Sequence, residues 1–289
     1  NTGGEITDSV QQSVRRFYGD SAVILYPKNN FNGRRAHANR LNFGNLPDAI
    51  SEDGKLNVDE VYRCFIDFND SEQLDKVIEC CKKEGKNAAI IWEPVQGEGG
   101  VNASTPAYIE SLKKHQANGD LLIIADEVQT GLCGPSNSKG MLSAYLGVNP
   151  SVLMLAKALT LGRMAGSCAI MCKDFAEKAY PPGVDGGTFS GSPVVSDLII
   201  KADEFWHDNE GANLDRLHEI GEERKHQLRK ALEENPNEYI KGIKGIGPMG
   251  GVEFVSSEAA HHYHEVFIHL GQHLKETKDP HAPVIPDEK

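Results

Sequence analysis

The sequence feature that most constrains the fold is a series of short, apolar, β-branched runs separated by helical stretches. These runs occupy residues 21–27, 88–94, 121–127, 151–157 and 165–172. Between the second and third, Thr105 suits a helix N-cap, Pro106 suits the first helical position and Gly119 suits the helix end. Strands that are apolar on both faces and joined by helices predict a mostly parallel sheet, with functional sites at the carboxyl ends of its strands.

Two candidate functional residues stand at such strand ends, Asp126 after one apolar run and Lys157 after the next. An apolar strand that ends on a carboxylate can hold Mg²⁺ in a nucleoside triphosphatase or the ring nitrogen of an organic cofactor. The chain has no GxxxxGK[ST] motif, which a triphosphatase needs to hold the phosphates. Lys157 could instead form a Schiff base, and we expect its apolar sequence neighbours to desolvate the amine in part.

Other residues could complete a site for pyridoxal phosphate, which needs an acid beside the ring nitrogen, an anion cradle and a flat surface along the ring. Asp126, when ionised, would keep the ring nitrogen protonated. The amides of Gly3 and Gly4 and the hydroxyl of Thr188 suit a phosphate. Phe31 could stack on the ring.

Four motifs in this order resemble the class III (ornithine/acetylornithine-type) aminotransferases, a branch of the fold-type I pyridoxal-phosphate enzymes. They are AAIIWEPVQGEGGV (88–101), IADEVQTG (124–131), LAKAL (155–159) and GGTFSGSP (186–193). The resemblance runs from Asn1 to about Phe254. It implies a large α/β domain that binds pyridoxal phosphate over residues 1–235, with a mostly parallel sheet and helices on both faces. A small C-terminal α+β remnant and tail would follow over 236–289.

The resemblance also assigns roles to individual residues. The cofactor-binding residues it implies are Gly3, Gly4, Phe31, Asp126, Val128, Gln129, Lys157 and Thr188. Lys157 would carry the Schiff base and then act as general base, while Asp126 would pair with the pyridinium nitrogen. Val128 would lie under the ring and Gln129 beside its phenolic oxygen. Thr188 would reach the phosphate of the other subunit, since the family forms homodimers whose sites are completed across the interface.

The implied activity is transfer of an amino group from an amino acid, such as ornithine or acetylornithine, to a 2-oxo acid. Arg34 matches a family arginine that meets a substrate carboxylate, and Glu98 matches the acid that gates specificity in ornithine-type members. An aminomutase, racemase or phospho-lyase would use the same lysine and aspartate, and the sequence does not separate these activities.

Several departures from the family pattern leave a second interpretation open. The family closes with an arginine that grips a carboxylate, but Asp279 or His281 stands where that guanidinium would be. The family segment before Asn1 is absent, which indicates a processed chain or a piece of a longer one, and the Gly-Gly after the lysine is Thr160-Leu161. The alternative is therefore a degenerate homologue that serves as a structural subunit of a larger assembly, with or without bound pyridoxal phosphate.

The composition of the chain limits the kinds of partner it is expected to bind and the cellular compartment it suits. Lys and Arg total 30 against 42 Asp and Glu, and the net charge of -12 disfavours nucleic acid and anionic lipid surfaces. No apolar run approaches the roughly 18 residues of a membrane span. Six cysteines without CxxC spacing favour a reducing compartment, the cytoplasm or the mitochondrial matrix. We expect no metal, because no closed zinc pattern is matched by the tail histidines His261, His262, His264, His269 and His273.

Overall fold

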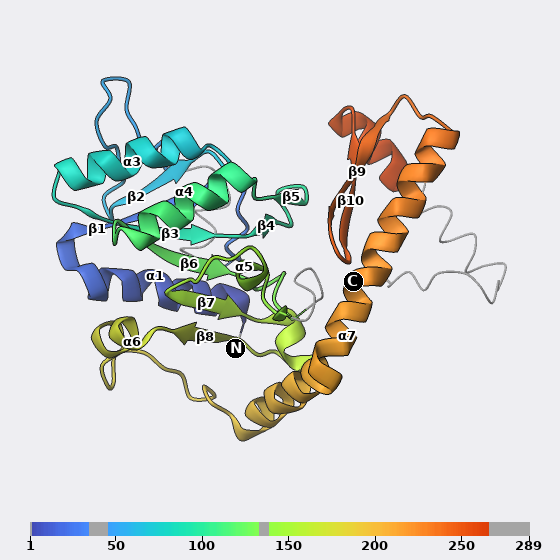
Figure 1. The fold of residues 1–289 in the computed structure, drawn as a ribbon. Helices are drawn as coiled ribbons and strands as arrows, with labels where there is room; N and C mark the ends of the chain where they lie inside the picture. Colours follow the sequence, from blue (N-terminus) through green and yellow to red (C-terminus); the bar gives the residue numbers. More distant parts are fainter. Residues whose placement is uncertain (1, 35–45, 133–138, 266–289) are drawn as a thin grey trace. The chain divides into compact units, whose positions relative to one another are not determined.

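A six-stranded sheet forms the centre of the computed structural model, which describes residues 2–34, 46–132 and 139–265. Its strand order is β2-β1-β3-β6-β7-β8 (Figure 1). The strands are β1 (Ala22–Pro27), β2 (Arg63–Ile66), β3 (Asn87–Trp92), β6 (Leu121–Asp126), β7 (Val152–Leu155) and β8 (Cys168–Met171). All neighbouring pairs are parallel except β7 and β8, which are antiparallel. The prediction of a mostly parallel sheet is confirmed.

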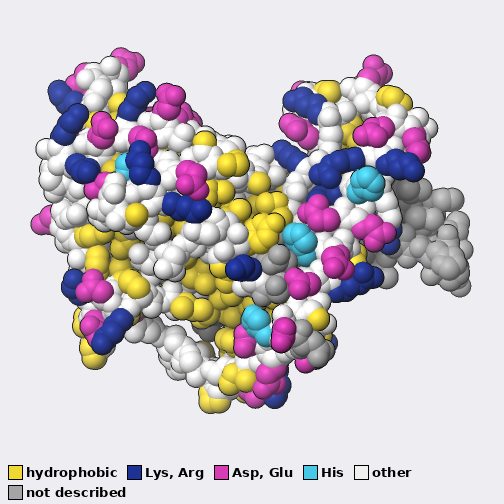
Figure 2. Space-filling view, viewed as in Figure 1, with side chains coloured by type: hydrophobic (Ala, Val, Ile, Leu, Met, Phe, Trp, Pro, Cys, Tyr) yellow, Lys and Arg dark blue, Asp and Glu magenta, His cyan; other side chains and the backbone are white. Residues whose placement is uncertain are grey.

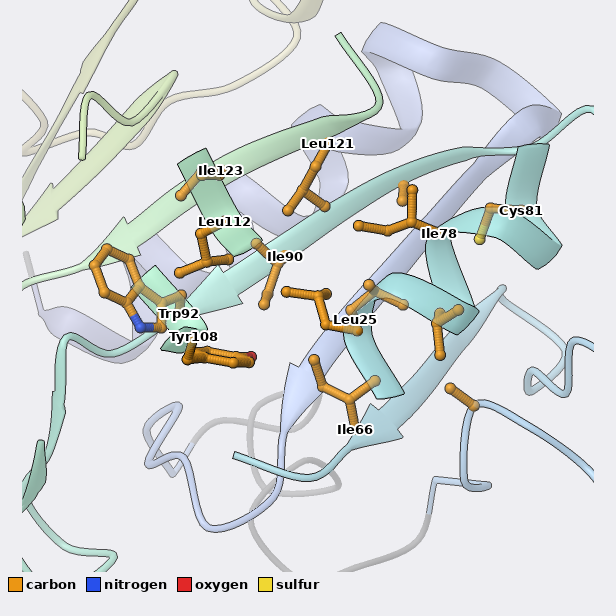
Figure 3. Close-up of a cluster of buried hydrophobic side chains, with 14 of the residues drawn as sticks. Leu25, Ile66, Ile78, Cys81, Ile90, Trp92, Tyr108, Leu112, Leu121 and Ile123 are labelled. Atoms are coloured by element: carbon orange, nitrogen blue, oxygen red, sulfur yellow. The ribbon is translucent and has the colours of Figure 1, made fainter. Parts of the chain in front are cut away.

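Helices cover both faces of this sheet (Figure 1). The helices are α1 (Gly3–Tyr18), α3 (Ser71–Lys83), α4 (Pro106–Ala117), α5 (Leu142–Tyr145), α6 (Lys173–Ala179) and α7 (Pro193–Glu234), with short 3-10 turns η1 (Gly19–Ser21) and η3 (Lys157–Thr160). On one face, Ile78 of α3 and Leu112 of α4 pack in a buried cluster with Ile90 and Ile123 of the sheet (Figure 3). On the other face, α1 and α6 bury their apolar side chains against the sheet.

The helix between β3 and β6 forms as its sequence predicts. Thr105 is the N-cap of α4, and its hydroxyl accepts a hydrogen bond of 3.4 Å from the amide of Tyr108. Pro106 occupies the first helical position, where its missing amide hydrogen costs nothing. Gly119 follows the helix with φ of 74°, in the left-handed region that favours glycine. These local signals are sufficient to place α4.

The chain divides into two compact units. One comprises the described residues of Asn1–Glu223 and Gly245–Gly250, and the other those of Arg224–Lys244 and Gly251–Lys289. Helix α7 ends at Glu234, as expected for a helix that stops before a proline at 236. Two hairpins accompany these elements: β4 (Val95–Gln96) with β5 (Asn102–Ala103), and β9 (Ile240–Ile246) with β10 (Met249–Phe254). No helix in the described part of the chain is both long and apolar enough to cross a membrane.

Candidate active site

A cavity of about 410 Å³ opens where the parallel strands of the large unit end. This volume is typical of small-molecule sites, which occupy roughly 300–1,000 Å³. Its lining comes from Thr2, Gly3, Gly4, Thr7, Phe31, Asn32, Gly33, Asp126, Val128, Ala156, Lys157, Gly162, Met164, Ala165 and Gly166. Six residues expected at a cofactor site are thereby brought together from four separate segments: Gly3, Gly4, Phe31, Asp126, Val128 and Lys157.

The sheet itself brings Asp126 and Lys157 to the same cavity. Asp126 ends β6 and pairs in register with Met154 of β7, and Lys157 follows β7. Asp126 is buried, whereas Lys157 is exposed. The expectation that apolar neighbours desolvate the amine is therefore wrong, because Leu155 and Leu159 turn away and pack in a separate cluster. The backbone turns sharply at Lys157, whose φ of 44° is uncommon for a residue with a side chain.

Asp126 has the electrostatics of a buried acid that faces a cation. Its carboxylate accepts a hydrogen bond of 3.1 Å from the amide of Val128. Burial raises the pKa of Asp126 to about 6, although the Val128 amide and the charge of Lys157 both oppose this rise. A cationic group placed beside Asp126 would favour its ionised form, so the residue suits the ring nitrogen of a pyridine cofactor.

The adjacent carboxylate, Glu127, has a structural role. It accepts hydrogen bonds from the amides of Leu142 and Ser143 at 2.6 and 2.8 Å and from the hydroxyls of Ser143 and Thr130. Glu127 is fully buried, and burial raises its pKa in spite of these bonds. The two adjacent acids therefore have different roles: Glu127 fixes the start of α5, and Asp126 lines the cavity.

The N-terminus of α1 forms one wall of the cavity and suits an anion. Thr2 and Glu5 form a capping box, with the amide of each bonded to the side chain of the other at 2.9 and 3.3 Å. Gly3 and Gly4 lie in the first turn, where backbone amides have no partner within the helix and the helix dipole favours negative charge. A Cβ on Gly3 would lie 2.9 Å from Val128 Cγ1, so only glycine permits this close approach. This cradle fits a phosphate group.

Two further predicted residues, Gln129 and Glu98, are not part of the cavity lining. The side chain of Gln129 packs directly on Gly97, where an added Cβ would lie 1.7 Å from Gln129 Oε1. Glu98 is exposed in the turn between β4 and β5. The roles expected of Gln129 at the phenolic oxygen and of Glu98 as a substrate gate stay predictions.

Arg34 and Thr188 are also outside the cavity lining of the single chain. The Arg34 guanidinium lies 5.9 Å from the centre of the Phe31 ring, over its face, and the residue is exposed. Thr188 is exposed in the segment between α6 and α7. Their expected roles at a substrate carboxylate and at a partner subunit's phosphate stay predictions. Asp279 and His281, which replace the tail arginine, are outside the described residues, as are two of the tail histidines.

The structure adds lining residues that sequence reasoning missed. Thr7 is one helical turn beyond Gly3, and Asn32 adjoins Phe31, so their spacing from recognised residues was the available signal. The segment 162–166 reaches the cavity because the Thr160 hydroxyl donates a hydrogen bond of 2.6 Å to the carbonyl of Met164. That contact depends on tertiary folding and has no signature in the sequence. The described residues contain no group of three or more His, Cys, Asp or Glu arranged to hold a metal.

A covered, mostly parallel sheet of this kind is the large-domain fold of the fold-type I pyridoxal-phosphate enzymes, and in this chain the strand ends bring a lysine, a buried aspartate and a helix N-terminus to one cavity. The sequence matches the aminotransferase class-III family over residues 28–281. The chain belongs to this family, whose cofactor is pyridoxal phosphate.

Individual relatives agree with this assignment. The ornithine aminotransferase of Staphylococcus carnosus is 31% identical over 290 residues, covering 96% of this chain and 67% of that protein. The acetylornithine aminotransferase of Oceanobacillus iheyensis is 28% identical over 272 residues, covering 90% and 62%. The ornithine aminotransferase structure from Toxoplasma gondii has a TM-score of 0.72 at 28% identity, covering 88% of this chain and 58% of that one. The chain thus spans about three fifths to two thirds of the length of these relatives.

The close approach of Gly3 to Val128 yields a testable prediction. In Gly3→Ala, the new methyl group would press on Val128 and move the first turn of α1 away from the cavity. We expect the dissociation constant for pyridoxal phosphate to rise about tenfold, or about 1.4 kcal/mol. Absorbance titration of the chain with pyridoxal phosphate measures this dissociation constant. Gly242→Ala is the matched control, because an added Cβ there meets nothing within 4 Å. Equal affinities in the two variants would contradict the phosphate cradle.

Proposed function

We propose that this chain binds pyridoxal phosphate in the 410 Å³ cavity and transfers an amino group from an amino acid to a 2-oxo acid. The observation that carries the proposal is the shared lining of one cavity by Lys157, Asp126 and the N-terminus of α1. Ornithine or acetylornithine is the proposed donor, since relatives with these names match most of the chain.

The chain's own residues would perform distinct parts of the reaction. When bound, pyridoxal phosphate supplies an electron-accepting ring that stabilises negative charge on the substrate α-carbon. The amine of Lys157 would hold the cofactor covalently and, once displaced by the donor, move the proton at that α-carbon. Asp126 would hold a proton on the ring nitrogen. The amides of Gly3 and Gly4 would bind the phosphate.

The ring and the substrate would be held by the remaining residues. Phe31 and Val128 line the cavity and supply apolar surfaces for the faces of the ring. Arg34 lies next to Gly33 of the lining and is proposed to meet the substrate carboxylate. Glu98 is proposed to discriminate between donors, because an exposed carboxylate can pair with a second amino group such as that of ornithine.

We further propose that the site is completed by a second copy of the chain. The segment around Thr188 exposes large apolar side chains, with Phe189 74%, Val194 59% and Ile200 56% accessible. Hydrophobic side chains also gather on the face of the large unit that Figure 2 shows. Apolar surface of this kind is typical of a protein interface.

The free cysteines of the described chain, including buried Cys64 and Cys81, suit the cytoplasm or the mitochondrial matrix.

The same exposed apolar surface favours a second candidate, a structural subunit of a larger assembly. Half-reactions of the cofactor-loaded chain distinguish an aminotransferase from a structural subunit. We expect ornithine, acetylornithine or a related donor to shift the absorbance of the cofactor-loaded chain from the visible to the near ultraviolet, and a 2-oxo acid to reverse the shift. A loaded chain that responds to no donor in a broad panel would favour the structural subunit.

A further inference from the structure

Glu93 joins two loops of the chain, one of which carries Phe31 of the cavity lining. It follows β3, is 5% exposed and does not line the cavity itself. Its Oε1 accepts a hydrogen bond of 2.5 Å from the amide of Phe31, in the loop after β1. Its Oε2 accepts a longer one, 3.4 Å, from the amide of Gly97, in the turn after β4. One carboxyl group therefore fixes the backbone of two loops that are distant in sequence.

Both loops bear on residues of the cofactor site. Phe31 lines the cavity, and Gly97 packs directly against the side chain of Gln129. A second bridge reinforces the connection, because Asn30 donates to the carbonyl of Ile91 at 2.9 Å and accepts from Gln96 at 2.8 Å. A shift of the Glu93 carboxyl would be transmitted to the Phe31 ring on one side and to Gln129 on the other.

Glu93 also interacts electrostatically with Asp126 and Lys157 of the cavity lining. Burial and the nearby charge of Asp126 raise the pKa of Glu93 to about 8, while the amides of Phe31 and Gly97 and the charge of Lys157 oppose the rise. Two buried carboxyl groups that interact in this way are unfavourable as two anions.

We propose that Glu93 is a positioning residue: its carboxyl group, bonded to the amides of both loops, holds Phe31 and, through Gly97, Gln129 in place beside the cofactor. The inference rests on the proposed function, since it concerns how tightly and in what orientation pyridoxal phosphate is bound.

Two substitutions separate the reach of the Glu93 side chain from its second acceptor oxygen. Glu93→Gln keeps the length and the oxygen that accepts from Phe31, but places an NH2 group, which cannot accept a hydrogen bond, toward the amide of Gly97. Glu93→Asp keeps both oxygens on a side chain that is one methylene too short. Asp59→Asn is the matched control, because Asp59 is a nearly buried carboxylate that also accepts two backbone amides, those of Val61 and Arg63, but lies outside the cavity lining. Pyridoxal phosphate affinity at pH 7, induced circular dichroism of the bound cofactor and melting temperature without ligand would be measured.

We expect Glu93→Gln to bind pyridoxal phosphate about threefold more weakly than wild type with nearly unchanged dichroism, because it keeps the bond to Phe31 and loses only the longer one to Gly97. Glu93→Asp should bind at least about tenfold more weakly with altered dichroism, and Asp59→Asn should lose stability while keeping both cofactor signals. A loss of affinity in Glu93→Gln as large as that in Glu93→Asp, or wild-type behaviour of Glu93→Asp, would overturn the inference alone. A wild-type chain that binds no pyridoxal phosphate would instead overturn the proposed function, and this inference with it.

Discussion

In Lys157→Ala, borohydride reduction is expected to attach no pyridoxal phosphate to the chain, and the rate of amino transfer should fall by on the order of 10³-fold. Lys157 carries the only amine among the described residues that line the cavity, so no neighbouring side chain can replace it. Mass spectrometry of the reduced protein would show the added cofactor mass on wild type, located in the peptide that contains Lys157, and none on the variant.

Lys173→Ala is the control for this substitution. Lys173 begins α6, its side chain is 86% exposed and it pairs only loosely with Glu177 at 3.7 Å. Its removal should leave both the covalent attachment and the rate unchanged. Covalent attachment that persists in Lys157→Ala would show that another lysine holds the cofactor. A persistent rate would remove Lys157 from the proton transfer.

The parts of the fold that the sequence predicts best are those set by local patterns. The apolar runs around β3, β6 and β7 and the capping signals of α4 depend on residues close together in the chain, and the structure confirms them. The capping box of Thr2 and Glu5 is an equally local signal, carried by residues three positions apart. Helix α1 is nevertheless not among the predicted elements, because the glycines between these residues were interpreted as a phosphate cradle alone.

Features that arise from contacts distant in sequence could not be predicted. Glu127 bonds to Leu142 and Ser143, which lie 15 and 16 positions further along the chain, so nothing local shows which of the two adjacent acids is structural. The exposure of Lys157 depends on where Leu155 and its neighbours find their packing partners. The importance of Glu93 follows from bonds to loops that the sheet brings together. Such contacts exist only once the sheet has formed.

The ligand-free chain is expected to lose stability as pH rises from about 4 to 8, and Asp126→Asn to be more stable than wild type above pH 6. An acid whose pKa is higher in the folded state stabilises the fold fully below its unfolded pKa, and that contribution is lost as pH rises through the folded pKa. For Asp126 the pKa rises from 3.8 to about 6, which corresponds to a loss on the order of 3 kcal/mol. Glu93 extends this loss of stability to about pH 8, because its pKa rises from 4.5 to about 8.

Asp126→Asn removes both the buried charge and part of the effect on Glu93, since Asp126 is one cause of the raised pKa of Glu93. Urea unfolding at several pH values should show the variant's advantage at pH 8 and its disappearance near pH 4, while amino transfer falls sharply. Asp75→Asn should be less stable than wild type at neutral pH. Although partial burial opposes it, hydrogen bonds to Lys114, Ser111 and His115 lower the pKa of Asp75 to about 2, so its ionised form stabilises the fold. If Asp126→Asn is less stable than wild type at every pH, the acid is held by favourable contacts. If it is more stable and inactive, the chain retains a destabilising charge at the position where the protonated ring nitrogen of the cofactor would need it.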